Sequence, residues 1–212
     1  LQKSVEGFDL FVRCIGIGPQ VRYVKYDPGA PLHDRYQLDT GFMSEADQRT
    51  VRNTTMTINS FFGWDFNSAE MLRHSGVFHP IDFANACPDS QVTSLHYHFP
   101  WLVKAKLRWA LFIAATKRPF RLNLNWQPYY DIANDDSIDD KLSAYAALAA
   151  KHFDEERFLE FCHQHLAHLD EVAYDFFGSD DGRQAMRQKV AALFPEHEVD
   201  ELTELFFQRV QR

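Results

Sequence analysis

The pattern of the sequence changes at Pro100, and this change constrains the possible folds more than any other feature. Before it, short apolar runs alternate with glycine and proline turns, which is typical of strands. After it, most apolar residues recur at helical spacing. We therefore predict an α+β fold, with an antiparallel-sheet subdomain over residues 1–125 and a helical extension over residues 126–212 that can also pack onto the front.

Two hairpins and one capped helix are expected in the front part. "DLFVRCIGIG" and "QVRYVKYDP" form the first hairpin, and "NSAEMLRH" and "VFHPIDF" form the second, around Ser75 and Gly76. Between them, Ser44 is followed three residues later by Asp47, the spacing of a capping box. The helix that starts there is expected to end at Gly63.

Further helices are expected after Pro100. One follows directly, the segment "NLNWQPYYDIANDDS" interrupts the pattern, and later helices cover roughly 139–153, 155–177 and 180–194. A last helix begins near Glu196.

Composition excludes several classes of protein. With 45% hydrophobic and 15% aromatic residues the chain can bury a core, so it is not a disordered protein. No apolar run approaches the roughly 18 residues of a membrane span, so no membrane association is expected. Three widely spaced cysteines without a CxxC pair predict free thiols in a reducing cytoplasm. The sequence begins with "LQKSVEGFDL", which has no initial methionine and none of the features of a signal peptide. We therefore expect this chain to be the C-terminal part of a longer polypeptide.

The charge is concentrated in the tail. Residues 138–212 carry 8 Lys and Arg but 16 Asp and Glu, whereas the charges of the preceding residues balance. Nucleic-acid binding requires phosphate neutralisation, so no nucleic-acid partner is expected. Homo-oligomerisation is possible.

A possible cation site lies in the second hairpin. Glu70 and Asp82 are 12 residues apart around a tight turn, so they can lie on adjacent strands and on one face. Asn85 follows three residues later. Two carboxylates and an amide are ligands that suit Mg²⁺. The alternative is that both carboxylates flank the turn and face water.

The order of these features resembles the C-terminal half of an ATP-grasp domain. The similarity covers about residues 1–90, from "LQKSVEGFDLFVRCIGIG" through the helix to "GWDFNSAEMLRHSGVFHPIDFAN". That fold belongs to ATP-dependent ligases that join a carboxylate to an amine with release of ADP. The resemblance therefore implies ATP and Mg²⁺ as cofactors, a carboxylate and an amine as substrates, and a preceding half-domain as partner.

Carried over by position, Gln2 to Val5 correspond to the hinge whose backbone recognises adenine. The resemblance implies that the carbonyl of Lys3 faces the exocyclic amine and that the N–H of Val5 faces a ring nitrogen. Asp9 falls where the family places an acid on the ribose hydroxyls, and Ile81 falls against the adenine face.

The same resemblance assigns the metal and phosphate contacts. Glu70, Asp82 and Asn85 match the acids and the asparagine that bridge Mg²⁺ to the β- and γ-phosphates. The candidate cations for phosphate or acyl-phosphate contacts are Arg13, Lys25 and Arg35. Such groups stabilise the charge that is spread over a transferring phosphoryl group.

The sequence departs from the family pattern at three positions. Two residues rather than one separate the last acid from the asparagine, that acid is an aspartate, and Ser68 stands where related ligases often carry an arginine. A non-catalytic nucleotide-binding or scaffold module, with the acidic helices as a docking element, is therefore the alternative. Because the family's other half supplies lysines and a glycine-rich loop, the 212-residue chain itself is expected to bind nucleotide weakly and to lack ligase activity.

A pair of histidines gives a weaker signal. His96 and His98 alternate in "HYHFPW", which predicts a strand with both rings on one face. That spacing is compatible with a metal pair, but half-buried polar contacts beside the aromatic residues are the favoured interpretation.

Overall fold

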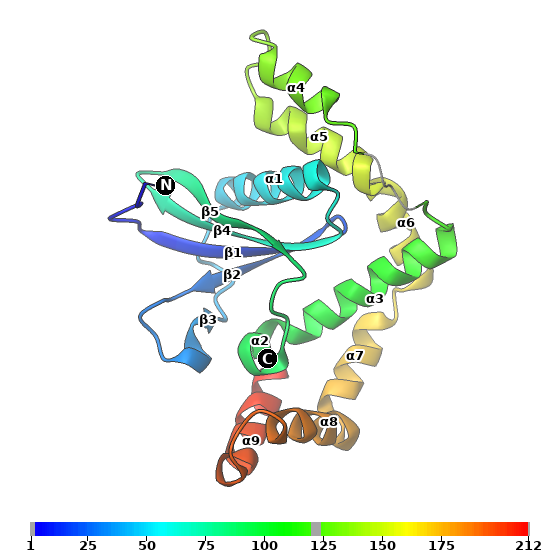
Figure 1. Ribbon diagram of the computed structural model, residues 1–212. Coiled ribbons are helices and arrows are strands. Elements are labelled where there is room, and N and C mark those ends of the chain that lie inside the picture. The colour runs from blue at the N-terminus through cyan, green and yellow to red at the C-terminus, as the bar shows by residue number, and fades with distance from the viewer. Residues whose placement is uncertain (1–2, 120–123, 212) are drawn as a thin grey trace.

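The described residues form one five-stranded antiparallel sheet with helices around it (Figure 1). The computed structural model describes residues 3–119 and 124–211. The strands are β1 (Leu10–Ile17), β2 (Gln20–Tyr26), β3 (Tyr36–Gln37), β4 (Phe66–His74) and β5 (Val77–Ala86). Their order in the sheet is β3-β2-β1-β4-β5. The α+β class predicted from the sequence is confirmed.

Both predicted hairpins are present, and each turn uses backbone with positive φ. Gly18, with a φ of 54°, lies between β1 and β2, where a Cβ atom would meet the ring of Trp109 at 2.4 Å. Ser75 and Gly76 join β4 to β5 with φ values of 50° and 77°. Two successive positive φ values give the two-residue turn whose twist matches that of the flanking strands.

The helix between the hairpins has the predicted ends. α1 (Glu45–Phe62) begins after Ser44, whose Oγ accepts a hydrogen bond of 3.1 Å from the N–H of Asp47. It ends at Gly63, which adopts the left-handed conformation and donates its N–H to the last turn. Both ends were predicted from local sequence alone.

We expect Ser44→Ala to lower the free energy of unfolding by about 1 kcal/mol, because the N–H of Asp47 loses its acceptor. Urea denaturation of both proteins measures the difference. Ser44→Asp provides the control, since aspartate also accepts at this position, and it should retain most of the stability. Equal losses in the two variants would show that the cap does not stabilise α1.

Alternation along the strands divides the sheet into two apolar faces. Leu10, Val12 and Cys14 of β1 pack with Val51 of α1 on one face. Ile15 and the residues around it pack on the other face, against α3 (Phe99–Thr116). The core on the α3 face also takes in Phe153 and Phe158 from the later helices. The front and the tail predicted from the sequence therefore share a core.

The remaining helices differ in part from the expectation. They are η1 (Leu32–Asp34), α2 (Val92–Leu95), η2 (His96–His98), α4 (Gln127–Asn134), α5 (Lys141–Phe153), α6 (Glu155–His165), α7 (Leu169–Gly178), α8 (Asp180–Ala191), η3 (Glu196–Glu198) and α9 (Val199–Val210). The helix expected over 155–177 is broken into α6 and α7. α4 lies inside the segment expected to be an interruption, where Pro128 takes a first-turn position that needs no N–H donor.

The last helix returns to the sheet subdomain. Arg209 of α9 forms an ion pair of 2.6 Å with Asp34 and donates a hydrogen bond of 2.8 Å to the carbonyl of His33. In Figure 1 the end of α9 accordingly lies beside α2, and Val210 packs with Val92. No helix in the described part of the chain is long and apolar enough to cross a membrane.

Candidate functional site

The two predicted metal acids face each other across the second hairpin. Glu70 of β4 and Asp82 of β5 are cross-strand partners. Directly opposed residues have their Cβ atoms about 5 Å apart, so both carboxylates lie on the same face. Glu70 is half-buried and Asp82 is exposed. The arrangement predicted from the 12-residue spacing is therefore present.

The pairing of β5 with β4 also fixes the position of Asn85. Ser68 pairs with Asn85 and Glu70 pairs with Asp82, so the residues at 83 and 84 together oppose a single residue of β4. This is a β-bulge. Because Ser68 and Glu70 share a face, their partners Asn85 and Asp82 share it as well. On a regular strand, three residues of separation would have placed them on opposite faces. The bulge thus brings Asn85 to the face of the acid pair although three residues separate it from Asp82.

A buried arginine lies on the other side of Glu70. Arg13 of β1 pairs with Glu70 of β4 and is only 3% exposed. Its Nη1 donates to the Tyr36 hydroxyl at 2.6 Å, and its Nη2 donates to the Asp89 carbonyl at 3.1 Å. Its Nε has no hydrogen-bond partner among the described residues, and neither has the buried Oγ of Ser68. Buried polar atoms without a partner are uncommon in folded proteins, and these two lie on the strands next to the acid pair.

The charges around Glu70 compensate only in part for its burial. Burial raises the pKa of its carboxyl group, Asp82 raises it further, and Arg13 lowers it. A cation between the two carboxylates would favour the ionised form and lower this pKa. The folded protein therefore keeps a carboxylate at a position where ionisation is unfavourable, as functional sites often do.

Glu70→Gln should stabilise the chain at pH 7 and raise its melting temperature by a few degrees. Because the pKa of Glu70 is raised in the folded state, ionisation above the unfolded pKa costs stability, and this cost disappears at lower pH. The gain should therefore vanish when melting is measured by calorimetry at pH 4. Glu196→Gln, at an exposed position of η3, is the control and should leave the melting temperature unchanged at both pH values. A loss of stability in Glu70→Gln at pH 7 contradicts this account.

The predicted adenine hinge lines a groove at one end of the second hairpin. This groove of about 730 Å³ is bordered by Lys3, Ser4, Val5, Glu6, His74, His79 and Pro80. Ile81 follows Pro80 directly, and Asp82 is three residues beyond His79, which is roughly 10 Å along a strand. The hinge thus lies beside β5, the edge strand that carries Ile81 and Asp82. Gln2 lies outside the described residues.

Asp9 already has a partner. Its two carboxylate oxygens accept hydrogen bonds of 3.1 and 2.9 Å from Arg73, which also forms an ion pair of 2.8 Å with Asp47. The hydrogen bond from Arg73 is the main cause that lowers the pKa of Asp9. A ribose hydroxyl at Asp9 would have to share the carboxylate with Arg73.

Lys25 and Arg35 are not brought to the acid pair. Lys25 pairs with Val12, whose side chain packs on the α1 face, so Lys25 lies on the face opposite to Arg13. Its Nζ forms an ion pair of 2.9 Å with Asp39. Arg35 donates from its Nε to the carbonyl of Ala30 at 3.2 Å, within the loop before β3. Of the three predicted cations, only Arg13 adjoins Glu70.

His96 and His98 do not lie on a strand, and this prediction was wrong. They form the single turn η2, and both side chains are buried. Burial lowers the pKa of each imidazole to about 4, with smaller opposing contributions from backbone hydrogen bonds. The favoured interpretation, polar contacts beside aromatic rings, agrees with the ring of Tyr97 against His96.

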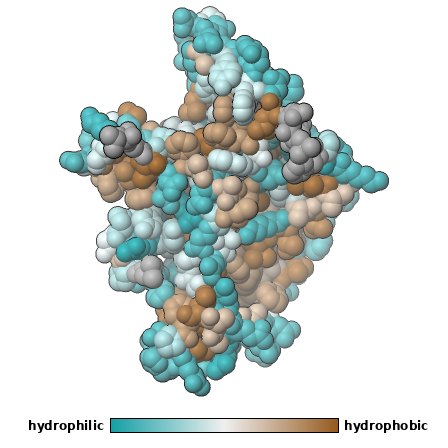
Figure 2. Space-filling model, in the orientation of Figure 1, coloured by the Kyte–Doolittle hydropathy of each residue, from teal (hydrophilic) through white to brown (hydrophobic). Residues whose placement is uncertain are grey.

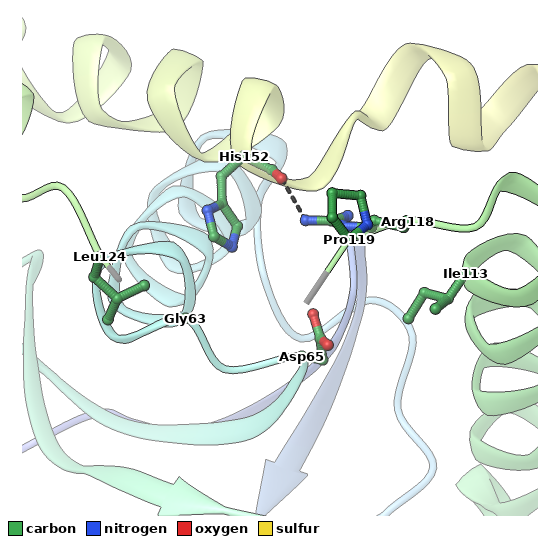
Figure 3. Close-up of a pocket in the computed structure, with 7 residues that line it drawn as sticks. All are labelled: Gly63, Asp65, Ile113, Arg118, Pro119, Leu124 and His152. Atoms are coloured by element: carbon green, nitrogen blue, oxygen red, sulfur yellow. Dashed lines mark hydrogen bonds between the residues drawn. The ribbon is translucent and has the colours of Figure 1, made fainter. Parts of the chain in front are cut away.

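A second, smaller cavity lies away from the acid pair. Its volume is about 90 Å³. Figure 3 shows the residues that line it, which are Gly63, Asp65, Ile113, Arg118, Pro119, Leu124 and His152. Arg118 donates to the carbonyls of His152 and Phe153 at 2.6 and 3.1 Å, where α5 ends. The guanidinium thus caps a helix, which gives this cavity a structural explanation.

The donor set at the sheet face limits the metal that it can hold. Within residues 3–119 and 124–211, no group of three or more His, Cys, Asp or Glu side chains is arranged to hold a metal ion. A cation there would have the carboxylates of Glu70 and Asp82 and the amide of Asn85. Mg²⁺ usually binds one or two protein carboxylates and completes its octahedron with water and phosphate oxygens, so this set fits it.

Several residues around the acid pair were not identified from the sequence. Tyr36 and the Asp89 carbonyl orient Arg13, and Asn67 contacts the bulge. No motif indicated them, because each acts through a contact with a distant part of the chain. Comparison with protein-family models, curated proteins and solved structures finds no match for this chain.

Proposed function

We propose that the chain is the MgATP-binding C-terminal half of an ATP-grasp ligase. Such a ligase activates a carboxylate as an acyl phosphate, releases ADP and passes the acyl group to an amine. The proposal rests on the resemblance over residues 1–90 and on the geometry of β4 and β5. The observation that carries it is the direct pairing of Glu70 with Asp82, with Asn85 on the same face.

The chain's own residues have distinct tasks under this proposal. Glu70, Asp82 and Asn85 would hold Mg²⁺, which, when bound, neutralises phosphate charge. Lys3 and Val5 border the large groove, where their backbone would contact adenine.

Arg13 would supply positive charge beside the phosphates. It is suited to this task because Tyr36 and Asp89 fix two of its nitrogens while its Nε has no partner among the described residues. Because its partners hold the side chain in place before a ligand arrives, little reorganisation is needed when charge develops. Lys25 and Arg35 would contact only ligand groups that lie away from Glu70 and Asp82.

We expect Asp82→Asn to abolish Mg²⁺-dependent ADP formation in a polypeptide that includes both ATP-grasp halves. The amide retains the size of the side chain but removes the charge that attracts the cation. A coupled ADP assay with a panel of carboxylates and amines measures the loss, which should exceed about 100-fold, a typical cost of removing one stabilising group from a reacting site.

Asp175→Asn is the matched control. Asp175 is an exposed acid on α7, and its replacement changes the net charge by the same amount. It should leave ADP formation unchanged. Undiminished turnover in Asp82→Asn would refute the assignment of Asp82 to the metal.

A non-catalytic binding module is the second candidate, and the surface of the helical region supports it. Tyr174 of α7 is 73% exposed, and Val172 and Phe176 of the same helix are also exposed. Figure 2 shows further apolar side chains around the position of α3, where Leu107 and Leu111 are exposed. Exposed apolar residues gathered on neighbouring helices are typical of interaction surfaces.

Nucleotide binding and turnover distinguish the two candidates. Calorimetric titration with MgATP, followed by the ADP assay, should show binding and turnover for a ligase. Binding that depends on Asp82 without ADP formation from any carboxylate would favour the binding module. We expect the 212-residue chain alone to bind MgATP weakly, because the proposed partner half supplies other phosphate contacts, and micromolar affinity for it would contradict that division.

A further inference from the structure

Asn67 contacts the bulge from the opposite face of the sheet. Its side chain is completely buried. Its Nδ2 donates to the carbonyl of Phe83 at 3.1 Å, and its Oδ1 accepts from the N–H of Asn85 at 3.1 Å. One side chain thus binds a carbonyl and an N–H on either side of residue 84.

These bonds address the weakness that a bulge creates. An extra residue leaves backbone groups without their partners in the ladder, and buried groups without partners are costly. Because Asn67 satisfies both groups, the register with two residues opposite one becomes favourable. Without it, the shift that carries Asn85 to the face of Glu70 would lose its support.

Asn67 is itself held by α1. Its Nδ2 also donates to the Oδ1 of Asn59 at 2.8 Å, and Asn59 is completely buried. Asn59 comes close to the sheet because β1 carries Gly16 at this point, where a Cβ atom would lie 2.4 Å from the Asn59 amide. A chain of contacts therefore runs from β1 through α1 to the bulge.

We propose that Asn67 is a positioning residue that sets the register of β5, so that Asn85 joins Glu70 and Asp82 at the cation site. The consequence for the cation rests on the proposed function, whereas the effect on the register does not. Asn67 touches no ligand itself and acts through the backbone of residues 83 and 85.

The test compares two variants of equal size change. Asn67→Ala removes all the bonds to the bulge, whereas Asn59→Ala removes a buried amide of the same volume and leaves these bonds in place. Mn²⁺ binding to the 212-residue chain, measured by electron paramagnetic resonance, should weaken at least tenfold in Asn67→Ala and less than threefold in Asn59→Ala. Equal weakening in the two variants, or none in Asn67→Ala, would overturn the proposal.

A second readout reports the register without any ligand. Opposed residues of an antiparallel pair give close Hα contacts or exchange backbone hydrogen bonds. The nuclear Overhauser contacts between Ser68 and Asn85 should be lost in Asn67→Ala, and the Asn85 amide should exchange at least tenfold faster. Contacts and protection that persist in Asn67→Ala overturn the proposal.

The two readouts separate the two hypotheses. If the wild-type chain binds no Mn²⁺, or if Glu70→Gln binds it as well as the wild type, the proposed metal site fails. The register readout then still decides the role of Asn67, because it needs no cation.

Discussion

Lowering the pH from 7 to 5 should reduce the free energy of unfolding by about 4 kcal/mol, roughly 2 kcal/mol for each of two buried histidines. His96 and His98 have pKa values of about 4 in the folded chain, against an ordinary value of 6.5. The unfolded chain therefore binds protons in this range that the folded chain does not. This contribution to stability is complete above the ordinary pKa and is lost as the pH falls towards 4.

The hydrogen bonds explain why both rings stay neutral. The N–H of Tyr97 donates to Nδ1 of His96, and Nε of Arg22 donates to Nδ1 of His98. Each Nδ1 is therefore an acceptor, and each Nε2 carries the proton and donates to a carbonyl, of His33 or of Gln37. Protonation at Nδ1 would set two donors against each other.

Nearby charges add to the effect. Arg209 lowers the pKa of His96 and Arg22 lowers that of His98, whereas Asp34 partly opposes the shift at His96. The titration of the carboxyl groups can be distinguished from that of the two histidines. Aspartates with lowered pKa values, such as Asp9 and Asp170, lose their contribution only at more acidic pH, and Glu70 has the opposite sign.

Urea denaturation at several pH values measures how steeply the free energy of unfolding changes with pH. His98→Gln keeps an N–H donor but cannot titrate, so its stability should fall less steeply between pH 7 and 5. His163→Gln, on the exposed face of α6, should keep the slope of the wild type. A slope that is unchanged in His98→Gln would show that the folded chain protonates His98 as readily as the unfolded chain does.

Arg13→Met should destabilise the chain at pH 7 by about 3 kcal/mol, because charged hydrogen bonds to Tyr36 and Asp89 are lost and Glu70 loses its nearest compensating cation. Methionine retains the volume of the side chain, so little cavity forms. The pKa of Glu70 should rise further, since Arg13 is the group that lowers it. The destabilisation should therefore be smaller at pH 4, where Glu70 is protonated.

A double-mutant cycle with Glu70→Gln isolates the electrostatic part. Arg13→Met combined with Glu70→Gln should recover part of the loss at pH 7, and the recovery should disappear at pH 4. Lys25→Met is the control on the other face, where the side chain is more exposed and its ion pair is worth little. Strict additivity of Arg13→Met and Glu70→Gln would show that the two groups do not interact.

Features that depend on neighbouring residues could be predicted from the sequence. The cap at Ser44, the left-handed residue at Gly63 and the turn at Ser75 and Gly76 each involve bonds within a few residues. The approximate opposition of Glu70 and Asp82 also follows from that turn, because a two-residue loop sets the register of the strands that it joins. A one-residue register shift beside Glu70, which the sequence did not indicate, brings Asp82 directly opposite.

Features that depend on contacts between distant parts of the chain could not be predicted from the sequence. The alternating pattern at His96 and His98 resembled a strand, but packing against α9 made it a helical turn. Lys25 was grouped with Arg13 because both lie on strands, and only the pairing of β1 with β2 showed that they occupy opposite faces. The break between α6 and α7 carries neither glycine nor proline at 166–168 to signal it.

The position of Asn85 illustrates the difference between what local sequence determines and what the folded chain determines. The sequence by itself determined that Asp82 and Asn85 are three residues apart, a spacing that on a regular strand would place their side chains on opposite faces. The tertiary structure decided that they share a face, because the pairing of β5 with β4 contains a bulge between them, and the buried side chain of Asn67 binds the backbone of that bulge. Backbone periodicity is local, whereas a shift in register needs bonding partners that only the folded chain brings together.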